Sequence, residues 1–190
     1  MATEAGPSNG LEKLAETLLA ACDSGFPLIV GLTGSVASGK STLAASLADR
    51  LSAETDVETV STDGFLHPNA TLEERGLMMR KGFPESYDTA RMAEAIARVR
   101  LLPAVFPAHS HVIYDIDPAL ARTISPPGIL ILEGLGFQPP SQGERASGEP
   151  DILIERMHLR ELVSDIFVLT KDIAILTFRN YPVYTVGISS

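Results

Sequence analysis

The sequence is short of the features that mark secreted, membrane and disulfide-stabilised proteins. Cys22 is its one cysteine among 190 residues, so an internal disulfide is excluded. No apolar run reaches the roughly 18 residues that a membrane-spanning helix needs. Residues 1–10 are polar and acidic, without the basic start and apolar stretch of a signal peptide. We therefore expect a cytoplasmic protein with no membrane partner.

Positive charge is also scarce, with 15 Lys and Arg against 24 Asp and Glu and a net charge of −9. Nucleic acid is therefore not expected as a partner, because the overall field repels it. An anionic nucleotide would have to be attracted by local cations, for which the candidates are Lys40, Arg75, Arg80 and Lys81. The 45% apolar content favours an ordered globular domain over disorder.

The most specific pattern present is a phosphate-binding loop at residues 34–41, which read GSVASGKS and match G-x-x-x-x-G-K-[ST]. It follows the apolar run 27–32 and precedes a stretch with helical spacing, the strand–loop–helix context that this motif requires. A chance match in a glycine-bearing turn is the alternative, which that context disfavours. The predicted ATP-binding residues are Gly34, Ser35, Val36, Ala37, Ser38, Gly39, Lys40, Ser41 and Thr42.

Each part of this loop has a distinct role in holding a phosphate tail. The glycines let the backbone approach closely, and the amides at the start of the following helix donate to phosphate oxygens. Lys40 would reach the outer phosphates, and the Ser41 hydroxyl would ligate Mg²⁺. ATP and Mg²⁺ are therefore the predicted cofactors.

Hydrophobic spacing predicts the neighbouring elements. Residues 11–22 and a stretch containing Leu43, Leu47 and Leu51 are spaced as amphipathic helices, and residues 57–61 as a strand. A capping box of Thr71 with Glu74 predicts a short helix ending near residue 76. Asp88 or Thr89 would cap a longer helix that buries Met92, Ile96 and Val99. Residues 101–116 are predicted as short extended pieces, and residues 165–190 as two or three strands.

Residues 128–132, GILIL, are continuously apolar, which is typical of a strand buried on both faces of a parallel sheet. This strand ends at Glu133, as the strand 57–61 ends near Asp63. Both carboxylates should therefore lie near the phosphate loop, at the carboxyl edge of the sheet. The predicted fold is α/β, a three-layer P-loop NTPase fold with a mainly parallel sheet flanked by helices. On residues alone, Asp63 in an ordinary turn and Glu133 solvating a strand end are competing interpretations.

Four further segments are distinctive: residues 62–69 (TDGFLHPN), 75–88 (RGLMMRKGFPESYD), 110–115 (SHVIYD) and 131–135 (ILEGL). Together they resemble the type I pantothenate kinases, relatives of uridine kinase and phosphoribulokinase. The resemblance covers residues 28–137 and touches again at 163–165, whereas residues 166–190 diverge. It implies a kinase domain over residues 27–190, preceded by a helix and lead-in over residues 1–26.

The resemblance implies phosphorylation of pantothenate by ATP, the committed step toward coenzyme A. Lys40 and the loop amides would hold the phosphates, and Ser41 with Glu133 would hold Mg²⁺. Asp63 would orient or deprotonate the attacking hydroxyl. His111 matches a family histidine at the pantothenate and coenzyme A site, and coenzyme A is implied as a regulator.

The remaining predicted substrate or coenzyme A residues are His109, Arg80, Lys81 and Tyr114. By default His109 and His111 are structural or exposed, and they lack metal-ligand spacing with the lone cysteine, so zinc is not predicted. Arg80 and Lys81 could equally form a solvated turn.

Departures from the family keep other functions open. His109 replaces the usual tyrosine and Ala45 an arginine linked to coenzyme A feedback, and residues 171–190 match no cationic lid helix. A missing lid would slow catalysis, since charge on the phosphoryl group would be less neutralised. The alternatives are a shortened, noncatalytic nucleotide or coenzyme A binding relative, or a nucleoside or small-alcohol kinase. Apolar strands in residues 165–188 would favour a homodimer if uncovered.

Overall fold

The computed structural model describes residues 7–22, 27–34 and 39–134, and the backbone of three strands at 165–169, 174–175 and 184–185. Its helices are α1 (Pro7–Ala21), α2 (Lys40–Leu51), α3 (Asn69–Glu74) and α4 (Thr89–Val99). Its strands are β1 (Leu28–Gly34), β2 (Val57–Ser61), β3 (Ala104–Phe106), β4 (His109–Ser110), β5 (Asp115–Ile116), β6 (Arg122–Ile124), β7 (Ile129–Gly134), β8 (Asp165–Leu169), β9 (Ala174–Ile175) and β10 (Tyr184–Thr185). Short 3-10 helices include η1 (Thr62–Phe65), directly after β2.

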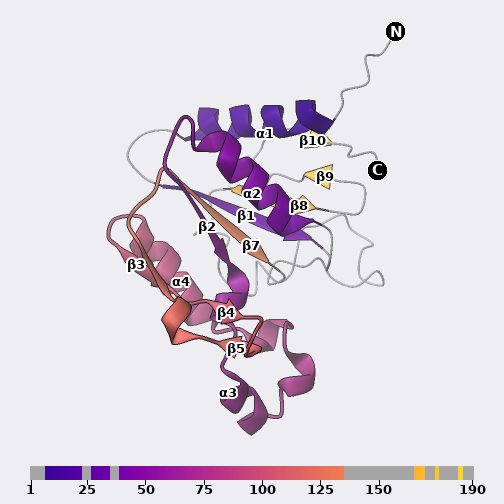
Figure 1. The fold of residues 1–190 in the computed structure, drawn as a ribbon, viewed down its shortest axis with the longest axis vertical. Helices are drawn as coiled ribbons and strands as arrows, with labels where there is room; N and C mark the ends of the chain where they lie inside the picture. The colour runs from indigo at the N-terminus through magenta and orange to yellow at the C-terminus, as the bar shows by residue number, and fades with distance from the viewer. Residues whose placement is uncertain are drawn as a thin grey trace.

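The central sheet is parallel and has the strand order β2-β7-β1-β8 (Figure 1). Leu32 of β1 and Ser61 of β2 both pair with Glu133 of β7, so the three strands end at the same edge. This register brings together the phosphate loop after β1, η1 after β2 and the end of β7. The predicted convergence of three strand ends is confirmed.

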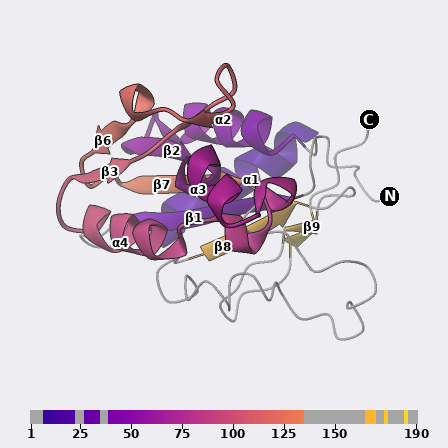
Figure 2. The same ribbon diagram turned by 90° about the horizontal axis from the view of Figure 1, so that it is seen from below.

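Alternate side chains of the central strands face opposite helical layers. Val30 and Ile131 pack with α1 and α2 in one apolar cluster, which includes Leu18 and Leu47. Ile29 and Leu130 belong to a second cluster with Ile96 of α4 and Phe106 of β3. In Figure 1, α1 and α2 lie on one side of the sheet, and in Figure 2, seen from below, α3 and α4 lie on the near side. The predicted three-layer α/β fold is confirmed.

The helix predictions hold with one exception. Met92, Ile96 and Val99 are buried on α4, and the Asp88 carboxylate accepts the capping hydrogen bond from the Arg91 N–H. The predicted capping box at Thr71 is wrong, because α3 begins at Asn69 after Pro68. The Asp115 carboxylate accepts a hydrogen bond from the Asn69 N–H, so the first turn of α3 is satisfied by a distant residue.

Strands outside the central sheet were predicted less completely. The short extended pieces at 101–116 correspond to β3, β4 and β5, whereas β6, which pairs with β3, was not predicted. Three strands lie in residues 165–190, and β8 joins the central sheet beside β1. The described helices include none that is long and apolar enough to span a membrane.

Candidate active site

The phosphate-loop serine contacts the carboxylate that ends β7. The Ser41 hydroxyl donates a hydrogen bond to Glu133 Oε2 at 3.2 Å. Ser41 lies in the first turn of α2, which follows Gly39 at a left-handed φ of 84°. Glycine adopts this conformation without the strain that a Cβ would add, which explains the residue at this turn. Two of the predicted metal-site oxygens are thus neighbours.

Lys40 interacts electrostatically with two carboxylates of the site, those of Glu133 and Asp63. Its side chain is buried, at 8% exposure. Burial lowers the pKa of Lys40, while the negative charges of Glu133 and Asp63 act in the opposite direction. A cation and two carboxylates from three different strand ends are therefore close enough to affect one another. Such a cluster can neutralise phosphates and align a reacting hydroxyl.

Asp63 is held by a tyrosine that was not predicted as a site residue. The Tyr87 hydroxyl donates a hydrogen bond to Asp63 Oδ1 at 3.0 Å, and Tyr87 is 4% exposed. Burial raises the pKa of Tyr87, and the negative charge of Asp63 raises it further. Tyr87 lies in the matched segment 75–88, so its motif was visible in the sequence. Its contact with Asp63 was not visible there, because it forms only when the chain folds.

A cavity of about 190 Å³ opens beside the acidic groups. It lies between β2, the segment 106–111 and β6, and its lining includes Asp63, Glu133, His109, His111 and Arg122. The Arg122 guanidinium pairs with Glu58, and its Nη1 donates to the Thr59 carbonyl at 3.4 Å. Arg122 was not predicted as a site residue, because nothing in the sequence places β6 beside β2.

Two lining residues carry buried polar atoms with no hydrogen-bond partner within the described part of the chain. They are Thr59, through Oγ1, and His109, through both ring nitrogens. Buried polar groups are nearly always hydrogen-bonded to protein, water or ligand. These two side chains are therefore exceptions among the polar groups of the site.

His109 is surrounded by predicted substrate residues. Its ring makes edge-on contacts with His111 and Tyr114, each at 5.5 Å between ring centroids. Burial lowers the pKa of His109, and the nearby positive charge of Lys81 lowers it further. The Lys81 ammonium lies over the Tyr114 ring and donates to the Tyr114 carbonyl at 2.7 Å and to Asn69 Oδ1 at 2.7 Å. Tyr114 contacts His109 and Lys81 lies near it, but neither is among the residues that line the cavity.

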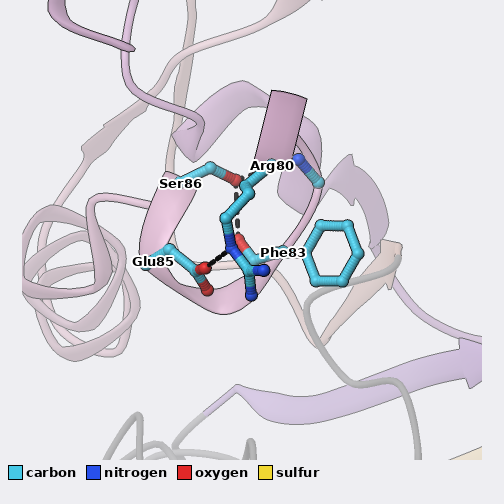
Figure 3. Close-up of polar contacts among 5 residues, drawn as sticks. Arg80, Phe83, Glu85 and Ser86 are labelled. Carbon is cyan, nitrogen blue, oxygen red and sulfur yellow. Dashed lines mark hydrogen bonds and ion pairs between the residues drawn. The ribbon is translucent and has the colours of Figure 1, made fainter. Parts of the chain in front are cut away.

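Arg80 is engaged in a local turn. Its guanidinium pairs with Glu85 and lies 4.6 Å from the centre of the Phe83 ring (Figure 3). The Ser86 hydroxyl closes the same turn by donating to the Phe83 carbonyl at 2.6 Å and accepting from the Gly82 N–H at 2.9 Å. Arg75, the other candidate cation, contacts His67 at 3.1 Å. The structure does not bring Arg80 to the cavity.

The predicted nucleotide-binding residues are partly visible. Gly34 ends β1, and Gly39, Lys40, Ser41 and Thr42 form the entry to α2, with Ser41 and Thr42 exposed. Ser35, Val36, Ala37 and Ser38 lie outside the described residues. No group of three or more His, Cys, Asp or Glu side chains able to hold a metal ion occurs among the residues described. Zinc had not been predicted at His109 and His111.

Curated relatives of the chain are pantothenate kinases. It is 43% identical over 170 residues to a pantothenate kinase of Brevibacillus brevis strain 47, covering 87% of this chain and 51% of that protein. It is 49% identical over 125 residues to a pantothenate kinase of Clavibacter sepedonicus, covering 63% and 39%. The chain thus spans about half the length of these relatives or less. No protein-family model matches it.

Two solved structures with a similar fold are named as candidate kinases. A candidate fructose transport system kinase from Silicibacter sp. TM1040 matches with a TM-score of 0.67 and 26% identity, over 83% of this chain and 73% of that one. A possible uridine kinase from Bacillus stearothermophilus matches with a TM-score of 0.64 and 18% identity, over 85% and 79%. The fold and the sequence relatives agree with the resemblance carried by the four motifs. This chain is a homologue of the pantothenate kinases, built on the P-loop kinase fold.

Proposed function

We propose that this chain transfers the γ-phosphoryl group of ATP to the primary hydroxyl of pantothenate, the first step of coenzyme A biosynthesis. One observation carries the proposal: the Ser41–Glu133 hydrogen bond brings the phosphate loop to a carboxylate beside Lys40 and Asp63. Phosphoryl transfer depends on positioning and charge neutralisation more than on covalent chemistry. These four side chains offer both at one edge of the sheet.

The residues present fit Mg²⁺. The Ser41 hydroxyl and the Glu133 carboxylate are hard oxygen donors, and Mg²⁺ commonly takes only one or two protein ligands besides phosphates and water. These two side chains would hold the ion, whose positive charge would offset the negative charge of the phosphates. Lys40 would hold the outer phosphates in the same place, since its ammonium lies within the field of Glu133 and Asp63.

The cavity beside Asp63 would hold the acceptor. Asp63 would align the acceptor hydroxyl and accept its proton in part, because a carboxylate near a metal ion is a weak base. His109, Thr59 and Arg122 line the cavity, and their polar and cationic side chains suit an acceptor with an amide and a carboxylate. Pantothenate carries both. His111, which lines the same cavity, would also contact coenzyme A if this end product of the pathway acts as a regulator.

A single assay tests the activity. The chain is incubated with Mg-ATP and pantothenate, uridine or no acceptor, and ADP and phosphorylated product are measured. Product with pantothenate supports the proposal. Product with uridine alone would assign a nucleoside kinase, and nucleotide binding without turnover would assign a noncatalytic binding protein. Either of those results would overturn it.

A further inference from the structure

Tyr87 contacts Asp63 from the protein interior. Its hydroxyl donates to Oδ1 at 3.0 Å, while Asp63 itself lines the cavity. We propose that Tyr87 is a positioning residue, which fixes the Asp63 carboxylate so that Oδ2 is left to meet the acceptor hydroxyl. This role rests on the proposed kinase activity.

The backbone around both residues is locked in register. Leu66 and Tyr87 form an antiparallel bridge. The Asp88 N–H donates to the Phe65 carbonyl at 2.7 Å, and the His67 N–H donates to the Ser86 carbonyl at 2.8 Å. The segment that carries Tyr87 is thus hydrogen-bonded through its backbone to the segment that follows Asp63. The distance between hydroxyl and carboxylate is therefore set by main-chain hydrogen bonds rather than by flexible side chains.

Tyr87 can act only as a donor in this place. Burial and the charge of Asp63 raise its pKa, so the hydroxyl keeps its proton at neutral pH. A neutral hydroxyl has one proton to give, and Asp63 Oδ1 receives it. Holding a catalytic group in one orientation avoids the entropy loss of ordering it during the reaction. Asp63 lies in the 3-10 turn after β2, and Tyr87 reaches its carboxylate from a different segment of the chain.

The alternative is a purely structural role, in which Asp63 only accepts the hydrogen bond of a buried tyrosine hydroxyl. Both interpretations predict some loss of stability when the hydroxyl is removed, because a buried hydrogen bond is lost. The two interpretations differ in the effect on turnover that they predict. A positioning residue acts through Asp63, so its effect on turnover must disappear when Asp63 is absent, whereas a purely structural effect must persist.

The test begins with Tyr87→Phe, which removes only the hydroxyl. Ser86→Ala is its matched control, since Ser86 is a neighbouring, fully buried hydroxyl that bonds the backbone of its own turn. We expect Tyr87→Phe to lower kcat about 10-fold or more with the KM for ATP unchanged, as for the loss of a supporting hydrogen bond in an active site. We expect Ser86→Ala to leave kcat near the wild-type value even where it lowers the unfolding midpoint.

The second stage repeats Tyr87→Phe in an Asp63→Ala background, measured by single turnover with enzyme in excess. No further loss of rate supports the positioning role, and an equal loss in both backgrounds overturns it while leaving the proposed function intact. A wild-type chain without turnover on any acceptor overturns both together. Should Tyr87→Phe fail to fold, the Tyr87 hydroxyl proton is followed by NMR. A slowly exchanging resonance that Asp63→Ala abolishes supports the contact, and an unaffected one overturns it.

Discussion

Ser41 Oγ donates to Glu133 Oε2 at 3.2 Å, across 92 positions of sequence. The contact exists because β1 and β7 are parallel neighbours, which places the start of α2 and the end of β7 at the same edge. It links the phosphate loop directly to an acidic side chain of the sheet.

Removing the Ser41 hydroxyl should weaken the binding of Mg²⁺ at the proposed metal site. We expect Ser41→Ala to raise the Mg²⁺ concentration needed for half-maximal activity by roughly 10-fold or more, a loss typical of metal-site partners. The measurement is phosphorylation rate against Mg²⁺ at saturating ATP. Ser52→Ala is the control, because Ser52 lies at the other end of α2 and its hydroxyl donates to the Ala48 carbonyl. An unchanged Mg²⁺ requirement in Ser41→Ala would remove Ser41 from the metal site.

Asp63→Asn should lower turnover and leave the binding of Mg-ATP nearly unchanged. The amide keeps the size of the carboxylate but cannot accept a proton or hold negative charge beside the acceptor. We expect kcat to fall by about 10²- to 10⁴-fold, the range for loss of a general base. Mg-ATP affinity, measured by calorimetry, should change little. Near-normal turnover would exclude Asp63 from catalysis.

The stability of the protein should depend on pH through His109. Its pKa is lowered on folding, so the unfolded chain binds the proton more readily. The stabilisation is then fully present above the unfolded pKa of about 6.5 and is lost as the pH falls toward the folded value. We expect urea midpoints to fall more steeply on acidification in the wild type than in His109→Tyr. Equal slopes would show that His109 does not titrate on unfolding.

Gly64→Ala should disturb the acceptor cavity. A Cβ on Gly64 would lie 2.0 Å from the Pro107 carbonyl oxygen, so the segment that leads to His109 must shift. We expect a loss of about 1–3 kcal/mol in unfolding free energy, as for overpacking, with a raised KM for the acceptor.

Gly76→Ala is the control for that substitution. Gly76 has a φ of +67° and open space around its Cβ position, so alanine there costs backbone strain of about 1–2 kcal/mol and leaves the cavity unchanged. A raised acceptor KM in both variants would show that general destabilisation, not displacement of Pro107, is responsible.

Local sequence patterns predicted the features that depend on neighbouring residues. The strand at 57–61, the buried face of α4 and the convergence of the loop with Asp63 and Glu133 follow from spacing and from the geometry of parallel sheets. The capping of α3 could not be predicted in this way, because the hydrogen bond to the Asn69 N–H is accepted by Asp115, 46 residues away. Tyr87 and Arg122 were missed for the same reason: their partners, Asp63 and Glu58, meet them only in the folded chain.

The cavity borders β2, the outermost strand on its side of the central sheet, and its far wall is built by β6 and the segment 106–111. The groups assigned to the phosphates follow β1 and β7, deeper in that sheet. Glu133 lines the cavity and also contacts Ser41, so the proposed acceptor and nucleotide sites share this carboxylate, while their other groups come from separate segments of the chain. Under the proposed function, substitutions in β6 and in the segment 106–111 would change which alcohol is accepted and would leave Lys40 and Ser41 in place.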